Sequence, residues 1–378
     1  MGTASKLTSY LIAATLGVTI TLSGCSNGSD SSNNSDNELR SLQAAQSDIE
    51  ALMVDFLATT GAPGVLVGVQ VGEETPLLLA EGIDEINTGE VLVADRIFRI
   101  GSVTKPVVAS VALATIKAGD MALADTIGSY LPGVTNGEAT IAQVLAHDAG
   151  LSDWDAIDGG IRTLLFADIS RNWQPSEIVE AVGFLPAHSE PGNGFHYSNP
   201  GYQMLGAILE QVNGATISEQ VTAILSTPYG LDDIRLGPLA EQPERLIHGW
   251  GDLGGNLIDN QLLPSVSIDS LFYTTGAGYS DLDDLLRFVR LYWGSEGALS
   301  IDGVDVAEDR SGNYGFATQF FSEEVVGHTG DINGARTAVG HQRNLDVSVV
   351  VHVNTNTIDR QPTVDLALGV IDALRVAQ

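Results

Sequence analysis

The sequence predicts an α/β (α+β) fold, in which an antiparallel β-sheet from both chain ends is flanked by helices and interrupted by an inserted, mostly helical subdomain. Apolar β-rich segments and helical periodicity occur near both ends, and the middle consists of helical patches between Gly/Pro turns. Elements with one apolar face must bury it against another layer, so the terminal elements are expected to pack together. We assign the α/β part to about residues 38–119 and 271–378, and the helical part to about 120–270.

The N-terminal part of this unit, residues 38–378, is predicted as helix, strand, strand. Residues 38–57 carry apolar side chains at nearly a 3.6-residue period, and Gly61 with Pro63 ends the helix. Two apolar runs separated by a turn follow, at residues 65–71 and 77–80. Near the C-terminus, further strand candidates precede a segment with helical spacing: residues 314–321, 324–328, 335–339 and 347–353, then 364–376.

The charge of the chain excludes one class of partner. Its 378 residues include 48 Asp and Glu against 17 Lys and Arg, which gives a formal net charge of −31. This charge repels nucleic acid, and no basic stretch offsets it. We therefore expect no nucleic-acid partner, and the length is sufficient for a sizeable buried core.

Residues 1–24 are predicted to be a lipoprotein signal peptide. Lys6 precedes an apolar core at residues 11–22, which is shorter than the roughly 20 residues of a spanning helix. The segment ends in Leu-Ser-Gly-Cys25, which resembles the bacterial lipobox, and Cys25 is the only cysteine, so no internal disulfide can form. Residues 25–37 have the composition of a flexible tether. We expect export and a lipid anchor on Cys25 in the cell envelope, on the periplasmic side with the outer membrane preferred; a secretory peptide cut nearby is the alternative.

The first candidate for chemistry is the pair Ser102 and Lys105. Both stand at the start of an apolar run, residues 106–116, that is predicted to be a helix buried on every side. Pro106 is tolerated only in a first turn, which places the helix start near Ser102 or Val103. Positions i and i+3 share a helix face, so the hydroxyl meets the amine. Burial favours a neutral amine that can accept a serine proton; a Ser N-cap beside a solvated Lys is the structural alternative.

Two later segments supply further polar groups. Residues 191–200 are rich in turn formers and precede a predicted helix at 203–212, so Tyr197 and Asn199 are expected on a loop. A tyrosine beside a lysine can relay protons, and an Asn amide can both donate and accept hydrogen bonds. Residues 326–331 stand at the end of a strand candidate, where a strand edge can present backbone N–H groups to an oxyanion.

Three short motifs carry a family resemblance. Ser-Val-Thr-Lys, Tyr-Ser-Asn and His-Thr-Gly occur in this order at residues 102–105, 197–199 and 328–330. They resemble the motifs of the serine β-lactamase and penicillin-binding protein superfamily. The His-Thr-Gly form is similar to soluble D-alanyl-D-alanine carboxypeptidases and their class C β-lactamase-like esterase relatives, and the likeness extends over about residues 64–354. The resemblance implies the β-lactamase/DD-peptidase fold and a serine hydrolase.

The resemblance also implies roles for the catalytic residues. Ser102 would attack the substrate carbonyl and form an acyl-enzyme, and Lys105 would accept its proton. Tyr197 would relay protons to the leaving group. The backbone N–H groups of Ser102 and Asp331 would form the oxyanion hole.

Substrate-binding residues follow from the same resemblance. Asn199 would hold the acyl side chain. His328 and Thr329, followed by Gly330 and Asp331, would line the leaving-group side.

Two positions depart from the carboxypeptidase pattern. Carboxypeptidases of this kind resemble one another in how they bind a terminal carboxylate. They use a hydroxyl residue directly after His-Thr-Gly and a cation on the preceding strand. This chain has Asp331 at the first place and Gln319 at the second. An acid would repel a carboxylate unless Arg336 points inward and compensates. Carboxypeptidase-like action on peptidoglycan-type peptides remains the first prediction, with a small-ester esterase as alternative. A true β-lactamase or a non-catalytic cell-wall-binding lipoprotein is less favoured.

No metal or organic cofactor is expected. The seven histidines show no metal-ligand spacing, the acidic clusters lack calcium-loop spacing, and there is no nucleotide-binding loop. The expected partners are a small-molecule or peptidoglycan-peptide substrate and, through Cys25, a membrane. We expect a monomer.

Overall fold

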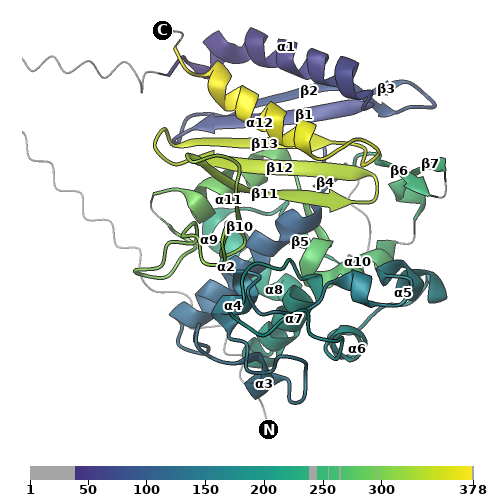
Figure 1. Cartoon of the computed structure of the whole chain (residues 1–378). Coiled ribbons are helices and arrows are strands. Elements are labelled where there is room, and N and C mark those ends of the chain that lie inside the picture. The colour runs from purple at the N-terminus through teal and green to yellow at the C-terminus, as the bar shows by residue number, and fades with distance from the viewer. Residues whose placement is uncertain (1–38, 238–244, 254, 264, 296, 377–378) are drawn as a thin grey trace, which may run out of the picture.

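A computed structural model describes residues 39–376 except 238–244, 254, 264 and 296 (Figure 1). The predicted signal peptide, Cys25 and the tether lie outside the described residues. Within the described part of the chain, no helix combines the length and the apolar character needed to cross a membrane.

One eight-stranded antiparallel sheet joins the two ends of the chain (Figure 1). Strands β1 and β13 are neighbours at its centre, with Val65 opposite Val353 and Val71 opposite Val347. The predicted antiparallel sheet from both chain ends is therefore confirmed. In spatial order the strands are β3 (Glu90–Val91), β2 (Leu77–Glu85), β1 (Gly64–Val71), β13 (Val347–Val353), β12 (Ala335–Gln342), β11 (Val325–Ile332), β10 (Thr318–Phe320) and β9 (Tyr314–Gly315).

Helices cover both faces of this sheet. Helices α1 (Leu42–Thr60) and α12 (Gln361–Ala373) pack on one face, where their apolar side chains form a cluster with alternate valines of β1 and β13. Helix α11 (Leu282–Trp293) packs on the other face, close to Gly68, where a Cβ would lie 2.9 Å from Leu286 Cδ1. Burial on both faces explains why the central strands are continuous apolar runs.

Helix α2 (Thr104–Lys117) runs between the sheet and the helical region, and eleven of its residues are buried. Helical segments surround it below the sheet in Figure 1: α3 (Ile127–Tyr130), α4 (Ile141–Leu145), a 3₁₀ turn (Trp154–Ala156), α5 (Ile161–Ala167), α6 (Pro175–Val182), α7 (Asn199–Asn213), α8 (Ile217–Val221), a π-helical turn (Thr222–Ser226) and α9 (Thr227–Tyr229). The all-round apolar pattern of residues 106–116 thus corresponds to a helix enclosed by other elements.

Short strands accompany these helices. Strands β4 (Phe98–Arg99), β8 (Gly278–Ser280) and β5 (Arg235–Leu236) form a small sheet in the order β4-β8-β5, and β6 (Trp250–Leu253) pairs with β7 (Asn256–Asp259). A 3₁₀ turn (Asn260–Leu262) and α10 (Ser265–Gly276) follow. The region between the two α/β segments therefore holds strands as well as helices.

A buried ion pair ties the small sheet to α10. Arg99 of β4 pairs with Asp269, whose second carboxylate oxygen accepts a hydrogen bond from the Tyr279 hydroxyl at 2.7 Å. Both charged side chains are almost fully buried. Because Arg99 stands three residues before Ser102, this pair braces the segment that leads into α2.

Candidate active site

Ser102 lies in a 3₁₀ turn (Gly101–Val103) that leads directly into α2. Gly101 has a φ of +52°, and a Cβ there would lie 2.7 Å from the Asp331 backbone nitrogen. No larger residue fits at Gly330 either, since an added Cβ would lie 2.0 Å from the Ile100 carbonyl oxygen. Two glycines therefore allow the backbone of β11 to lie against the turn that carries Ser102.

Lys105 is fully buried and its amine contacts three oxygen atoms. Its Nζ lies 3.3 Å from Ser102 Oγ, 2.7 Å from Asn199 Oδ1 and 3.0 Å from the Thr275 carbonyl oxygen. Burial lowers the pKa of Lys105 to about 7, and the charge of Asp153 acts in the opposite direction. In the neutral form, two N–H bonds can serve the two shorter contacts, so the lone pair is left for the Ser102 hydroxyl proton.

Tyr197 lies on the loop before α7, as predicted, with Lys105 Nζ 4.7 Å from its ring centroid. Burial raises the pKa of its hydroxyl above the ordinary value, and a hydrogen bond with Ser102 opposes this rise. The hydroxyl therefore stays protonated at neutral pH and is available as a proton donor. The buried His147 packs against the Tyr197 ring with its centroid 4.2 Å away and accepts a hydrogen bond from the Ser198 N–H at 3.1 Å, so it supports the loop that carries Tyr197.

Asn199 does not lie on a loop, so that prediction is wrong. It is the first residue of α7, because the Ser198 side chain caps the helix by accepting from the Gly201 N–H and Pro200 fits its first turn. Its side-chain oxygen accepts from Lys105, and its amide nitrogen donates to Asp153 at 2.9 Å. The amide therefore bridges Asp153 and Lys105 in addition to lining the cavity beside Ser102.

The prediction that the His-Thr-Gly motif stands at the end of a strand is wrong. The motif lies inside β11. The strand continues to Ile332 because a two-residue Asn-Gly turn pairs it with β12 up to Ala335. Among the residues that the structure describes, β10 pairs with β11 only at Gly327 and Val326. Beyond it, the Thr329 N–H donates to Gln319 Oε1 at 3.0 Å.

This edge of β11 directs a backbone donor toward Ser102. Successive strand residues alternate, so the Asp331 N–H points to the same edge as the Thr329 N–H, past the end of β10. The nitrogen of Ser102 lies 3.3 Å from the position of a Cβ on Gly330. The two N–H groups expected to form an oxyanion hole, on Ser102 and Asp331, therefore lie on adjoining segments of backbone.

The structure contradicts a substrate-lining role for His328. Its side chain is fully buried, its Nδ1 donates to the Thr329 carbonyl oxygen at 2.6 Å, and its Nε2 accepts from the Tyr314 hydroxyl at 2.7 Å. Burial lowers the pKa of His328 to about 3, so the ring is neutral at ordinary pH. Alternation along β11 accounts for this, because Thr329 lines the cavity while the preceding side chain points into the protein.

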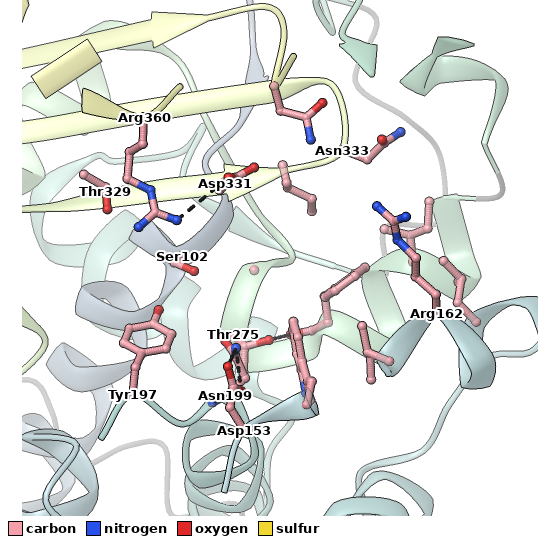
Figure 2. Close-up of a pocket in the computed structure, with 18 of the residues that line it drawn as sticks. Ser102, Asp153, Arg162, Tyr197, Asn199, Thr275, Thr329, Asp331, Asn333 and Arg360 are labelled. Atoms are coloured by element: carbon pink, nitrogen blue, oxygen red, sulfur yellow. Dashed lines mark hydrogen bonds and ion pairs between the residues drawn. The ribbon is translucent and has the colours of Figure 1, made fainter. Parts of the chain in front are cut away.

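Asp331 lines the cavity, but its charge is matched. Arg336, opposite it on β12, donates to its carboxylate at 2.6 Å, and Arg360 lies 3.8 Å away (Figure 2). Arg336 therefore compensates the acid, which is one of the two possibilities that the sequence left open. Arg360 is exposed and lines the same cavity.

A cavity of about 660 Å³ opens over Ser102. Tyr197, Thr329 and Arg360 lie on one side of Ser102 in Figure 2, and Asn333 and Arg162 lie on the other. Most of the remaining lining is apolar: Trp154, Ile161, Leu165, Phe166, Ile169, Phe195, Leu263, Ile268, Phe272 and Ile332. The volume is within the range of about 300–1,000 Å³ of small-molecule sites.

Asp153 and Arg360 are polar residues of this cavity that sequence reasoning did not find. Asp153 is one of 48 acidic residues, and no spacing distinguishes it. Arg360 stands directly before α12, near the C-terminus and far from Ser102 in the sequence, so only folding brings it to the site. The apolar lining likewise comes from separate segments.

Three carboxylates lie close together elsewhere in the structure. Among the described residues, carboxylates of Asp233, Asp281 and Asp284 lie within 4.8 Å of one another. Arg245 pairs with Asp233 and lies 3.9 Å from Asp281, and none of the three acids lines the cavity over Ser102. This cluster is therefore separate from the candidate active site.

The fold and the site together place the protein among the serine hydrolases. A family model described as beta-lactamase matches residues 49–370. The chain therefore belongs to the beta-lactamase family, which confirms the resemblance to the β-lactamase and penicillin-binding protein superfamily.

Several characterised proteins are similar to this chain. It is 29% identical over 185 residues to the esterase EstB of Burkholderia gladioli, which is 46% of each protein. It is 24% identical over 295 residues to penicillin-binding protein 4* of Bacillus subtilis, which covers 70% of this chain and 63% of that protein. The chain thus spans between about half and two thirds of these relatives.

Solved structures share the fold. The D-amino acid amidase from Ochrobactrum anthropi SV3, complexed with D-phenylalanine, has a TM-score of 0.74 at 20% identity, over 87% of this chain and 98% of that one. The penicillin-binding protein from Bacillus halodurans has a TM-score of 0.70 at 19% identity, over 85% and 99% of the two chains. These similarities establish the β-lactamase/DD-peptidase fold.

Proposed function

We propose that this serine hydrolase cleaves esters or amides of apolar acyl groups through an acyl-enzyme on Ser102. The proposal rests above all on one contact, between Ser102 Oγ and the fully buried Lys105 Nζ at 3.3 Å. A lysine whose pKa burial lowers to about 7 is an effective base at neutral pH.

In the acylation step, Lys105 Nζ takes the Ser102 proton as Oγ bonds to the substrate carbonyl carbon. The carbonyl oxygen becomes an oxyanion, which the N–H groups of Ser102 and Asp331 stabilise. The bond to the leaving group then breaks, and Tyr197 donates its hydroxyl proton to the departing alkoxide or amine. Lys105 returns its proton to Tyr197, so the site regains its starting protonation.

In the deacylation step, a water molecule attacks the acyl carbon of the ester on Ser102. Its proton passes to the Tyr197 and Lys105 pair, and the oxyanion occupies the same two N–H groups. The bond to Ser102 Oγ breaks, the serine recovers a proton from Lys105, and the carboxylic acid leaves. Asn199 holds the lysine amine throughout and Asp153 holds the Asn199 amide, so both act as positioning residues.

The apolar lining and the polar contacts on β11 favour ester hydrolysis over carboxypeptidase action. Gln319, at the place where a carboxypeptidase-like protein has a cation, is already engaged by Thr329. The similarity to an esterase supports the same choice. Carboxypeptidase-like activity is the second candidate, because Arg360 brings a cation to the side of the cavity that holds Tyr197 and Thr329.

Burst kinetics test the proposal. Wild-type protein mixed with excess 4-nitrophenyl acetate should release one equivalent of 4-nitrophenol rapidly when deacylation is slower, and then turn over steadily. Ser102→Ala should abolish both phases. Ser110→Ala, on the same buried helix but outside the cavity, is the matched control and should retain them. Unchanged turnover in Ser102→Ala would refute the proposal.

A further inference from the structure

Six apolar side chains from the segments around α5 and α10 line the cavity over Ser102. We call Leu165, Phe166, Ile169, Leu263, Ile268 and Phe272 the apolar wall. Leu165, Leu263 and Phe272 all pack against the cluster that contains the buried Ile268, which shows that segments around α5 and α10 meet there. Four members of the apolar wall are therefore packed together, and Phe166 and Ile169 line the same cavity from α5 and the residues just after its end.

The outer part of this wall is left uncovered by the residues that the structure describes. Phe166 is 50% exposed and Ile169 is 51% exposed. Leu262, next to the lining residue Leu263, is 79% exposed. Contiguous exposed apolar surface is uncommon on soluble proteins and often marks a binding site. The chain has a formal net charge of −31, so an exposed apolar surface contrasts with the rest of its composition. Because this surface adjoins the cavity, we infer that it receives an apolar group of a ligand.

The wall lies on the side of Ser102 that would receive the acyl group. Tyr197, which we propose as proton donor to the leaving group, lies on the same side of Ser102 as Thr329 and Arg360 (Figure 2). Arg162 lies on the opposite side, and it belongs to α5, which also carries part of the apolar wall. A substrate with its leaving group at Tyr197 therefore directs its acyl group along the wall.

We propose that the apolar wall is a subsite for a long or bulky acyl group, so that the substrates are esters or amides of medium-chain or arylalkanoic acids. This inference rests on the proposed function. The cavity of about 660 Å³ is far larger than an acetyl group requires. Complete burial of one methylene group of the substrate corresponds to about a fourfold gain in kcat/KM. A methylene that lies against a half-exposed wall is about half buried, so it should contribute about twofold.

A chain-length series tests the inference. For 4-nitrophenyl esters from acetyl to octanoyl, kcat/KM should rise about 60-fold, since six methylenes each contribute about twofold. The double variant F166S/I169S should flatten this dependence. Phe184→Ser is the matched control, because Phe184 is 58% exposed but lies outside the cavity, and its slope should equal that of wild type.

A second series separates the acyl side from the leaving-group side. Octyl acetate should be cleaved with no comparable gain over ethyl acetate, because its chain lies in the leaving group. A flat acyl series, or an equal gain in the alcohol series, would overturn the subsite while turnover through Ser102 persists. Absence of turnover of every ester, or turnover that is unchanged in Ser102→Ala, would instead refute the proposed function and the subsite with it.

Discussion

Acylation of this protein should accelerate as pH rises through the titration of Lys105. Burial lowers the pKa of this lysine from 10.5 to about 7. The neutral amine is the form that can take the Ser102 proton, so the competent fraction is small at low pH and increases with pH. His328 does not titrate in this range, because burial lowers its pKa to about 3.

The size of the effect follows from the shifted pKa. An ordinary lysine is neutral in about one molecule in 3,000 at pH 7, whereas Lys105 is neutral in about half. With a midpoint of about 7, the neutral fraction is about one tenth at pH 6 and about nine tenths at pH 8. The rate constant for acylation should therefore rise about tenfold between pH 6 and pH 8.

The assay is the pre-steady-state burst with 4-nitrophenyl acetate between pH 5 and pH 9, corrected for spontaneous hydrolysis. Asp153→Asn provides an internal check, because the charge of Asp153 raises the pKa of Lys105 and its removal should move the midpoint to lower pH. A residue with only a structural role would leave the midpoint in place. A flat profile, or a rise only toward pH 10, would refute the assignment of Lys105 as base.

Three further substitutions have defined outcomes. Gly330→Ala should abolish acylation, because its Cβ would lie 2.0 Å from a backbone oxygen of the segment before Ser102; wild-type burst amplitude would contradict this. Asp269→Ala should lower the free energy of unfolding by about 3–5 kcal/mol in urea denaturation, since it leaves the buried Arg99 charge unpaired. Asp48→Ala, which removes the partner of Arg40 in a surface ion pair, should cost about 1 kcal/mol or less. Equal losses would be inconsistent with the buried pair. Arg360→Gln should lower kcat/KM for acyl esters that carry a carboxylate in the leaving group, relative to neutral analogues. Arg162→Gln should leave this ratio unchanged. A parallel loss in both variants would argue against a direct contact between Arg360 and the leaving-group carboxylate.

Local sequence patterns predicted most of the fold. Apolar β-rich runs located β1 and β13, and apolar residues at helical spacing located α1 and α12, because these elements bury apolar side chains against other layers. The apolar run after Lys105 predicted both the buried helix and the contact between Ser102 and Lys105, since both residues stand in one helical turn. The lipid anchor on Cys25 stays a prediction, because it lies outside the described residues.

The errors have a common physical origin. A capping side chain at Ser198 extends α7 back to Asn199, and a turn beyond the predicted strand end extends β11 past His328. Strand alternation then turns His328 inward and Thr329 outward. The Asn-Gly hairpin between β11 and β12 sets Arg336 opposite Asp331, a local signal that sequence reasoning did not use. The arrival of Arg360 from the other chain end is a tertiary contact that no local pattern encodes.

The proposed acyl-enzyme chemistry depends most directly on Ser102 being an activated nucleophile. Intact-mass spectrometry of the folded protein after exposure to a fluorophosphonate tests this, with Ser102→Ala and Ser110→Ala measured in parallel. We expect one phosphonyl adduct on wild type and on Ser110→Ala, mapped to the peptide that contains Ser102, and none on Ser102→Ala. An adduct that persists on Ser102→Ala, or the absence of any adduct on wild type, would contradict it.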